Sequence, residues 1–208
     1  MDALAFAALP TDGSKPGAAH AGPHAGIGEP GTISDAQLLA LAAESHHQAF
    51  DALYVAYKAR IYSFLLRLLG DPELADDVTQ DAFTKAFTAL PRLDRGTKVL
   101  PWLYRVASNA GIDQARRRKR FVWLRMHHVQ NTSVEPAVQD GSRRVAEREH
   151  VQAVLRTLPA ENAVALLLHA LEGYSYKEIA EIQDCSLTAV RSRIARARAA
   201  FRRGYATK

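Results

Sequence analysis

The chain has 208 residues and a formal net charge of +5, and 48% of it is hydrophobic, 24% charged and 8% aromatic. This apolar content supplies a core for one large domain or two small ones, while the few aromatic residues argue against a β-sandwich. The single cysteine, Cys185, excludes an intramolecular disulfide and a cysteine-based zinc site. No apolar run approaches the ~20 residues that cross a bilayer, and Asp2 stands where a secretion signal carries a base. We therefore expect a cytoplasmic protein without membrane insertion.

The charges gather in three segments. Residues 71–94 carry six acids against two bases, residues 105–125 carry seven bases against one acid, and residues 187–208 carry seven bases and no acid. This distribution favours a polyanion bound at two places and a basic protein bound at a third. The alternative is an ordinary solvated helix surface.

The first half of the chain begins with an extension and then turns helical. Residues 1–33 are rich in Ala, Gly, Pro and His without a hydrophobic period, so we expect disorder there. Ser-Asp-Ala-Gln at 34–37 has the form of a capping box and predicts a helix start. Apolar residues at three- and four-residue steps from Phe50 to Leu68 predict a second helix that ends at Gly70.

Two more helices are predicted before the chain turns polar. Asp71-Pro72 places a capping acid before a proline at the first helical position, and this helix is expected to run to about Leu90. Another helix is expected from about Pro101 into an arginine run. Trp102 and Tyr104 lie two residues apart and so point to opposite faces of it, and we expect Trp102 to be the one in the core.

A polar tether and a helix-turn-helix pattern follow. Residues 119–144 lack a hydrophobic period, and helices are then expected over 145–157 and 159–171. A capping box at 175–178 starts a short helix, and a turn leads to a base-rich helix that begins at Leu187 and reaches about residue 203. We expect Leu187 to help close the apolar contact between these two helices. An αα-hairpin that contacts no DNA is the alternative.

No catalytic or metal-binding set is recognisable. The histidine pairs 46–47 and 127–128 consist of adjacent residues, which point in different directions on a helix. The acids at 76, 77 and 81 have neither a histidine nor a phosphate-binding glycine loop beside them. We therefore expect a protein that is not an enzyme and needs neither a cofactor nor a metal.

Several segments resemble parts of the bacterial sigma factors. The sequence Asp-Asp-Val-Thr-Gln-Asp-Ala-Phe at 76–83 looks like the helix with which that family binds RNA polymerase, and residues 102–118 look like the promoter-melting helix that follows it. Residues 172–180 and 190–198 look like the helix-turn-helix of the family's second domain. The order and spacing are those of the extracytoplasmic-function (ECF) type.

This resemblance implies an all-α fold of two small helical domains joined by a flexible linker. It places sigma region 2 at residues 34–118, the linker at 119–144 and sigma region 4 at 145–205. The implied function is the binding of core RNA polymerase and promoter-specific initiation of transcription. The implied partners are bacterial core RNA polymerase, promoter DNA and an anti-sigma factor.

The resemblance also assigns three sets of site residues: one for polymerase binding, one for recognition and melting of the minus-ten element, and one for reading the minus-thirty-five element. Exposed carboxylates would steer the polymerase encounter. Stacking of unpaired bases, at ~1–3 kcal/mol each, would offset strand separation at ~1.4 kcal/mol per base step. The three sets are, in that order, Asp76, Asp77, Gln80 and Asp81; Lys98, Leu100, Tyr104, Asn109, Arg116, Arg117 and Arg118; and Leu187, Thr188, Arg191, Ser192, Arg193 and Arg196.

Two other interpretations stay open at this point. One is a helix-turn-helix regulator that binds operators without polymerase. The other is a sigma mimic that sequesters an anti-sigma factor. Only a sigma factor gives promoter-specific starts with purified core polymerase, so run-off transcription distinguishes the three.

Overall fold

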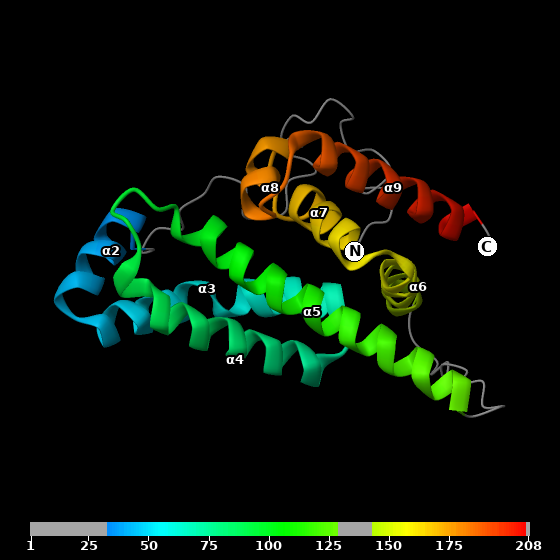
Figure 1. Ribbon diagram of the computed structural model, residues 1–208, viewed down its shortest axis with the longest axis horizontal. Helices are drawn as coiled ribbons and strands as arrows, with labels where there is room; N and C mark the ends of the chain where they lie inside the picture. The colour runs from blue at the N-terminus through cyan, green and yellow to red at the C-terminus, as the bar shows by residue number, and fades with distance from the viewer. Residues whose placement is uncertain (1–32, 129–142, 207–208) are drawn as a thin grey trace.

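Figure 1 shows the computed structural model, which describes residues 33–128 and 143–206. Within these ranges the regular structure is helical, as the sequence predicts, and no strand occurs. The predicted disordered extension and most of the predicted linker lie outside the described residues. Within the described ranges, no helix combines the length and apolar content that crossing a bilayer requires.

The first unit consists of four α-helices and one 3-10 turn. They are α2 (Asp35–Glu44), α3 (His46–Leu69), α4 (Pro72–Ala89), η1 (Leu90–Arg92) and α5 (Val99–His128). Helix α5 continues beyond the start of the predicted tether at residue 119. The boundaries of the two domains stay a prediction.

Local signals set the helix ends where the sequence predicts them. The Ser34 hydroxyl accepts a hydrogen bond from the backbone N–H of Gln37, and the Gln37 side-chain oxygen accepts one from the backbone N–H of Ser34. These two bonds form the capping box. Helix α3 ends at Gly70, whose φ of 67° is left-handed and whose N–H donates to the Leu66 carbonyl. The Asp71 carboxylate then accepts the Leu74 amide at 3.2 Å to begin α4.

The prediction that Trp102 occupies the core in preference to Tyr104 is wrong. Tyr104 is fully buried and Trp102 is only partly buried against the core. The Tyr104 ring packs edge-on against Phe64 of α3 and Tyr174 of the second unit, with centroids 5.2 and 5.6 Å away. Its hydroxyl accepts a hydrogen bond from Arg60, so the polar end of this buried side chain is satisfied.

The second unit consists of α6 (Arg143–Thr157), α7 (Ala160–Ala170), α8 (Tyr176–Ile182) and α9 (Leu187–Ala206). Ser175 and Glu178 form the predicted capping box at the start of α8. Asp184 turns the chain toward α9 with a left-handed φ of 49°, so α8, the turn and α9 form the predicted helix-turn-helix. The expectation that Leu187 closes the contact between them is wrong, because its side chain is 39% exposed.

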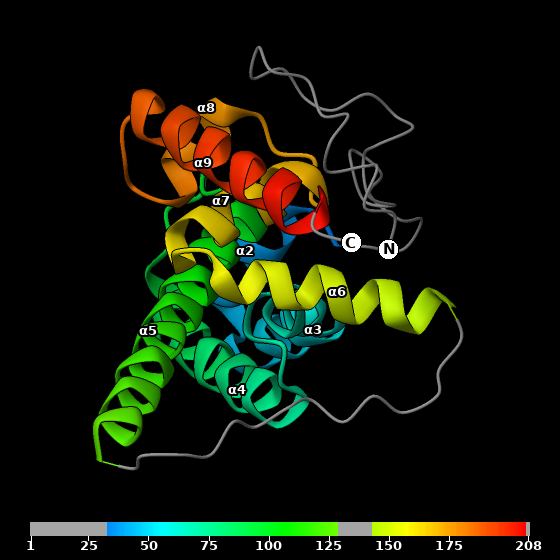
Figure 2. The same cartoon turned by 90° about the vertical axis from the view of Figure 1, so that its right-hand side faces the viewer.

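Helix α7 lies at the centre of the molecule. All of its residues except Glu161 are buried. Helices α8 and α9 cover it within its own unit, and α3 and α5 pack against it from the first unit. Figures 1 and 2 both show α7–α9 lying above α3–α5, with α6 alongside, so the described residues form one packed body.

Candidate nucleic-acid interface

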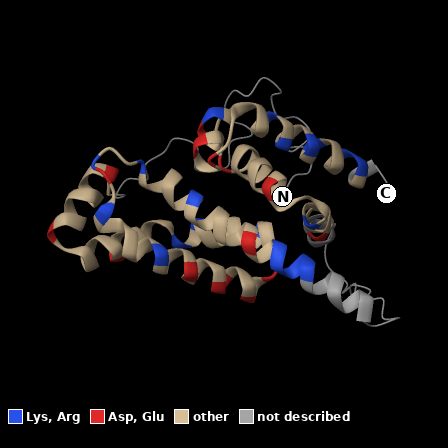
Figure 3. Cartoon of the chain, viewed as in Figure 1, with Lys and Arg blue, Asp and Glu red and all other residues tan. Residues whose placement is uncertain are grey.

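Charged side chains occupy distinct surfaces of this body (Figure 3). Acidic residues follow the outer edge of α4, whereas Lys and Arg gather toward the far end of α5 and along α9. Within the described residues, no group of three or more His, Cys, Asp and Glu side chains is arranged to hold a metal ion. The separation of the charges gives a negative surface on α4 and positive surfaces on α5 and α9, each suited to a partner of the opposite charge.

The acidic face of α4 comprises Asp76, Asp77, Gln80 and Asp81. The opposite side of the helix buries Val78, Ala82 and Phe83, which fixes the acidic face outward. Asp77, Gln80 and Asp81 are exposed, and Asp76 is half-buried and accepts a hydrogen bond from the Gln80 amide at 2.9 Å. The structure therefore brings the four predicted residues together on one solvent-facing surface.

An apolar groove of about 450 Å³ lies beside the acidic face and was not predicted. Helix α3 supplies most of its lining, and α4 supplies Asp76. Val55 is 84% exposed at this groove, and the Lys58 ammonium lies 5.1 Å from the centre of the Tyr54 ring. The available signal was Val55 itself, a branched apolar residue outside the apolar period of α3.

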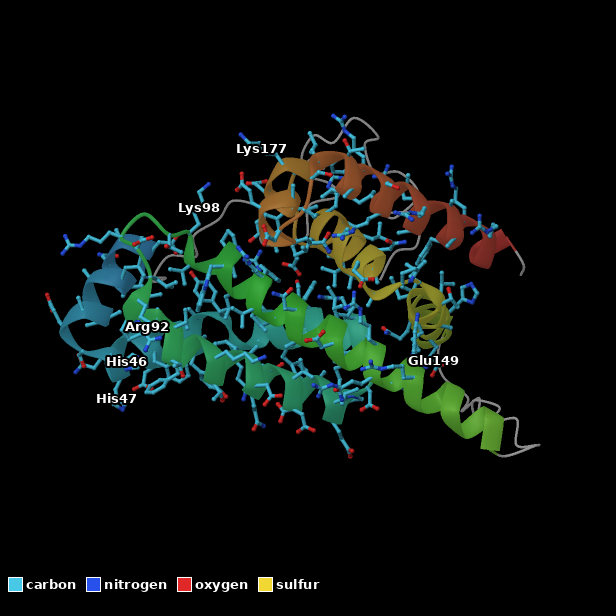
Figure 4. The ribbon with its side chains drawn as sticks, in the orientation of Figure 1. His46, His47, Arg92, Lys98, Glu149 and Lys177 are labelled. Atoms are coloured by element: carbon cyan, nitrogen blue, oxygen red, sulfur yellow. The ribbon has the colours of Figure 1, made fainter. Side chains whose placement is uncertain are left out.

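The predicted minus-ten residues lie along α5 and differ in accessibility. Lys98 is exposed at the start of the helix and points away from the body, as does Lys177 at the start of α8 (Figure 4). Leu100 is half-buried and Asn109 is exposed, whereas Tyr104 is inaccessible. In this conformation Tyr104 therefore cannot contact DNA, because α3 and the second unit enclose its ring.

The arginine run of α5 is exposed but partly engaged within the protein. Arg116 pairs with Glu161 of α7. Arg118 donates to the Leu69 carbonyl at 3.2 Å and lies 3.9 Å from the Asp71 carboxylate. Arg117 is exposed. Burial by itself raises the pKa of Glu161, but its backbone hydrogen bond and Arg116 outweigh this and lower that pKa, so the carboxylate stays charged.

The start of α9 presents most of the predicted minus-thirty-five residues. Leu187, Thr188, Arg191 and Ser192 are exposed at the N-terminal end of this helix. The Ser186 hydroxyl accepts the Ala189 amide at 3.1 Å and caps the helix. An α-helix fits the major groove with its N-terminal residues toward the base edges, so this end has the geometry of a recognition helix.

Two other arginines of α9 differ in their surroundings. Arg196 is exposed, as expected for a side chain that reaches phosphates. Arg193 is half-buried, and its Nη1 donates to the Gln183 side chain at 2.9 Å and to the Cys185 sulfur at 3.2 Å. Arg193 therefore stabilises the turn between α8 and α9 through hydrogen bonds to Gln183 and Cys185. Its predicted role as a DNA contact does not fit this conformation.

A buried polar cluster joins the two units and was also missed. Arg60 Nε donates to the Tyr104 hydroxyl at 2.9 Å and lies 3.1 Å from the Glu172 carboxylate. Burial by itself lowers the pKa of Arg60, but Tyr104 and Glu172 outweigh this and raise it. Burial is the main cause that raises the pKa of Tyr104, and the negative charge of Glu172 raises it further, so the tyrosine stays neutral. No local sequence pattern predicts the contacts of Arg60 with Tyr104 and Glu172, because these residues are far apart in the chain.

Both units match known sequence families. Residues 53–121 match the family model of Sigma-70 region 2, and residues 148–201 match that of Sigma-70, region 4. The chain is 33% identical to the RNA polymerase sigma-H factor of Pseudomonas aeruginosa over 80% of this chain and 91% of that protein. It is 33% identical to the ECF RNA polymerase sigma factor SigM of Bacillus subtilis over 71% of this chain and 90% of that protein. It is 31% identical to the ECF RNA polymerase sigma-E factor of Escherichia coli over 81% of this chain and 93% of that protein.

Solved structures resemble the fold as well. The structure of CnrH in complex with the cytosolic domain of CnrY matches with a TM-score of 0.63 at 24% identity, over 85% of this chain and 99% of that chain. The co-crystal structure of the sigma factor RpoE with the anti-sigma factor NepR from Bartonella quintana matches with a TM-score of 0.58 at 25% identity, over 75% and 96%.

The left-handed turn at Asp184 gives a stability prediction. Asp184→Gly and Asp184→Ala both remove the exposed ion pair with Arg105, so they differ only in the backbone conformation that they permit. We expect the glycine variant to be more stable by about 1 kcal/mol, because a Cβ is unfavourable at positive φ. Urea unfolding of the two purified proteins measures the difference.

The matched control is the same pair of substitutions at Glu181. This residue is exposed and lies inside α8, where alanine should be more stable than glycine by about 1 kcal/mol. Equal stabilities of the two Asp184 variants would contradict the interpretation of the turn.

Proposed function

The chain belongs to the ECF RNA polymerase sigma factors, and from this membership we propose that it binds core RNA polymerase and directs promoter-specific initiation of transcription. The observation that carries the proposal is the presence of both units in the family's order, with relatives above 30% identity that align over most of both chains. Transcription takes place where the bacterial chromosome is, so the proposed compartment is the cytoplasm.

The acidic face of α4 is the proposed contact for core polymerase. Its exposed carboxylates offer a negative surface to a basic partner, which accelerates the encounter and fixes its orientation. The neighbouring groove on α3 adds exposed apolar surface around Val55, which a bound partner would remove from water at a gain in free energy. The proposed surface is therefore larger than the four residues that the sequence indicates.

Helix α5 is the proposed contact for the minus-ten element. Lys98 and Leu100 would border the separated strands, Asn109 would contact a base, and Arg116, Arg117 and Arg118 would bind phosphates. Helix α9 is the proposed reader of the minus-thirty-five element in duplex form. Leu187, Thr188, Arg191 and Ser192 would face base edges, and Arg196 would bind phosphate.

An anti-sigma factor is a further proposed partner. One structural relative of 25% identity was solved as a complex with an anti-sigma factor. A protein that recruits polymerase to DNA through exposed charge can be controlled by a partner that covers those charges.

Run-off transcription tests the proposed function. Purified core polymerase is incubated with fragments of the source genome, with and without this protein, and the 5′ ends of the transcripts are mapped. We expect defined starts that appear only with the protein, because core polymerase alone does not select promoters. A regulator would alter existing starts and a sigma mimic would create none, so either result would refute the proposal.

Substitution of the acidic face should weaken polymerase binding. For Asp77→Ala and for Gln80→Ala, the dissociation constant for core polymerase should rise about tenfold, that is by about 1.4 kcal/mol, with a weaker salt dependence for Asp77→Ala. Titration of labelled protein with core polymerase measures this. Glu181→Ala removes an exposed acid on α8 and should bind as the unsubstituted protein does. Unchanged affinity of both α4 variants would discard the assignment.

Two arginines of α9 should affect DNA binding differently. Arg191→Ala should relax sequence preference at one position of the upstream element at a cost of about 1–3 kcal/mol, because this side chain is placed toward base edges. Arg196→Ala should weaken binding to all DNA sequences alike, because the protein would lose one phosphate contact. The slope of the logarithm of the binding constant against the logarithm of the salt concentration should fall in magnitude by about 1. Selection of duplexes from a randomised pool with the holoenzyme measures the sequence preference, and titration of one duplex at several salt concentrations measures the salt slope. Identical behaviour of the two variants would refute the division.

A further inference from the structure

We propose that the apolar groove on α3 is the docking site for residues 3–9 of this same chain, and that core polymerase displaces this segment when it binds. The docking concerns the protein alone, whereas the displacement rests on the proposed function. Residues 3–9 precede the part of the chain that the structure describes. The docked segment would cover apolar surface that the helices leave in water.

The groove is the place where the helices leave apolar surface uncovered. Of the large apolar side chains in the described residues, only Val55 and Leu187 are exposed, and Leu187 begins the helix that is proposed to meet DNA. Val55 lines the groove together with Tyr54 and Tyr62. The groove volume of about 450 Å³ lies within the ~300–1,000 Å³ of pockets that enclose a compact ligand, so a few side chains would fill it. Exposed apolar surface in such a hollow is typical of a binding site.

Residues 3–9 have the composition that such a groove requires. The run Ala-Leu-Ala-Phe-Ala-Ala-Leu is apolar throughout and contains no glycine, proline or charge. Its large side chains are Leu4, Phe6 and Leu9, and a run this short cannot bury them by folding on itself, so it gains free energy by covering apolar surface elsewhere. Asp2 precedes the run and Lys58 lines the groove, so two groups of opposite charge are available to orient the segment.

The linker between this segment and the first helix is long enough for docking. Residues 10–32 include six glycines and four prolines, and Ile27 is their only large apolar residue. This composition does not supply a core, so we expect a tether. For these 23 residues the scaling of a flexible chain, ~5–6 Å × √n, gives an average span of roughly 26 Å.

The linker joins the helices close to the groove. Ile33 packs against the core, and α2 packs on α3. Burial raises the pKa of the Tyr57 phenol and the charge of Asp35 raises it further, while Arg60 lowers it, so the start of α2 lies near Tyr57. Tyr57 belongs to the stretch of α3 that lines the groove, and the linker therefore has to pass around no more than one helix, ~10–12 Å in diameter. Its average span exceeds this distance.

Tethering makes even a weak contact effective. A short flexible linker gives the segment an effective concentration on the order of 1 mM at the groove. With a dissociation constant of about 0.2 mM the segment would then occupy the groove in about five of six molecules, although the same contact between separate molecules at micromolar concentration would be negligible. Asp76 belongs both to the groove lining and to the acidic face of α4. A partner that binds both surfaces must therefore displace the segment.

Photochemical cross-linking in the full chain tests the docking. Benzoylphenylalanine is incorporated in place of Phe6, the protein is irradiated at micromolar concentration, and mass spectrometry identifies the linked peptides. We expect cross-links within one molecule to residues 54–62 of α3, and no such preference when the label replaces Ile27. Val55→Ser should lower the yield about threefold, because the groove loses apolar surface. Ala56→Ser changes an exposed residue of α3 outside the groove lining and should leave the yield unchanged.

Titration with core polymerase tests the displacement. Phe6→Ser should lower the dissociation constant for core polymerase about fivefold, because polymerase no longer competes with an occupied groove. The matched control is Ile27→Ser, which makes the same kind of change in the linker and should bind as the unsubstituted protein does. Both residues precede the first described helix, so neither substitution removes a described contact.

The outcomes separate this proposal from the proposed function. Cross-links that map away from α3, or that join two molecules and increase with concentration, would overturn the docking. Equal affinities of Phe6→Ser and Ile27→Ser for core polymerase would overturn the displacement. A protein that binds no core polymerase but cross-links to residues 54–62 would refute the proposed function and leave the docking of residues 3–9 in place.

Discussion

The burial of α7 is the constraint on which the rest of the structure depends. A helix whose residues are buried on nearly every side is stable in water only when other elements surround it. Helices α8 and α9 cover part of α7, and α3 and α5 complete the enclosure. The two units therefore pack together through α7, and the charged pairs at the edge of this contact select one orientation of a packing that apolar burial already favours.

This packing separates the charged surfaces of the protein. Helix α4 packs on α3 and α5 with its apolar side and turns its carboxylates away from the second unit. Helix α5 lies between the two layers, and two of its basic residues, Arg105 and Arg116, pair with acids of the second unit. One molecule thus presents an exposed negative surface on α4 and a positive surface on α5 that is partly paired with acids of the same chain.

The sequence was sufficient where the cause of a feature lies within a few residues. Ser34, Gly70, Asp71 and Ser175 fix helix ends through contacts three or four residues away, so these ends were predictable. The four residues on the outward face of α4 were indicated by the resemblance of residues 76–83 to the polymerase-binding helix of sigma factors. The burial of Tyr104 was not predictable, because it depends on Arg60 and Tyr174, which are distant in the chain. The half-burial of Arg193 depends likewise on how the turn folds back on α9.

The central position of α7 also determines where this protein tolerates change. A residue such as Leu166 or Leu167 is fully buried, and the α7 helix that carries it serves both its own unit and the boundary between units. A larger or polar replacement there disturbs two interfaces at once, whereas a change at an outer position of α4 or α9 alters one binding surface and leaves the packing intact. A substitution that changes binding without loss of stability is therefore expected in the outer helices, whereas the middle helix tolerates few replacements.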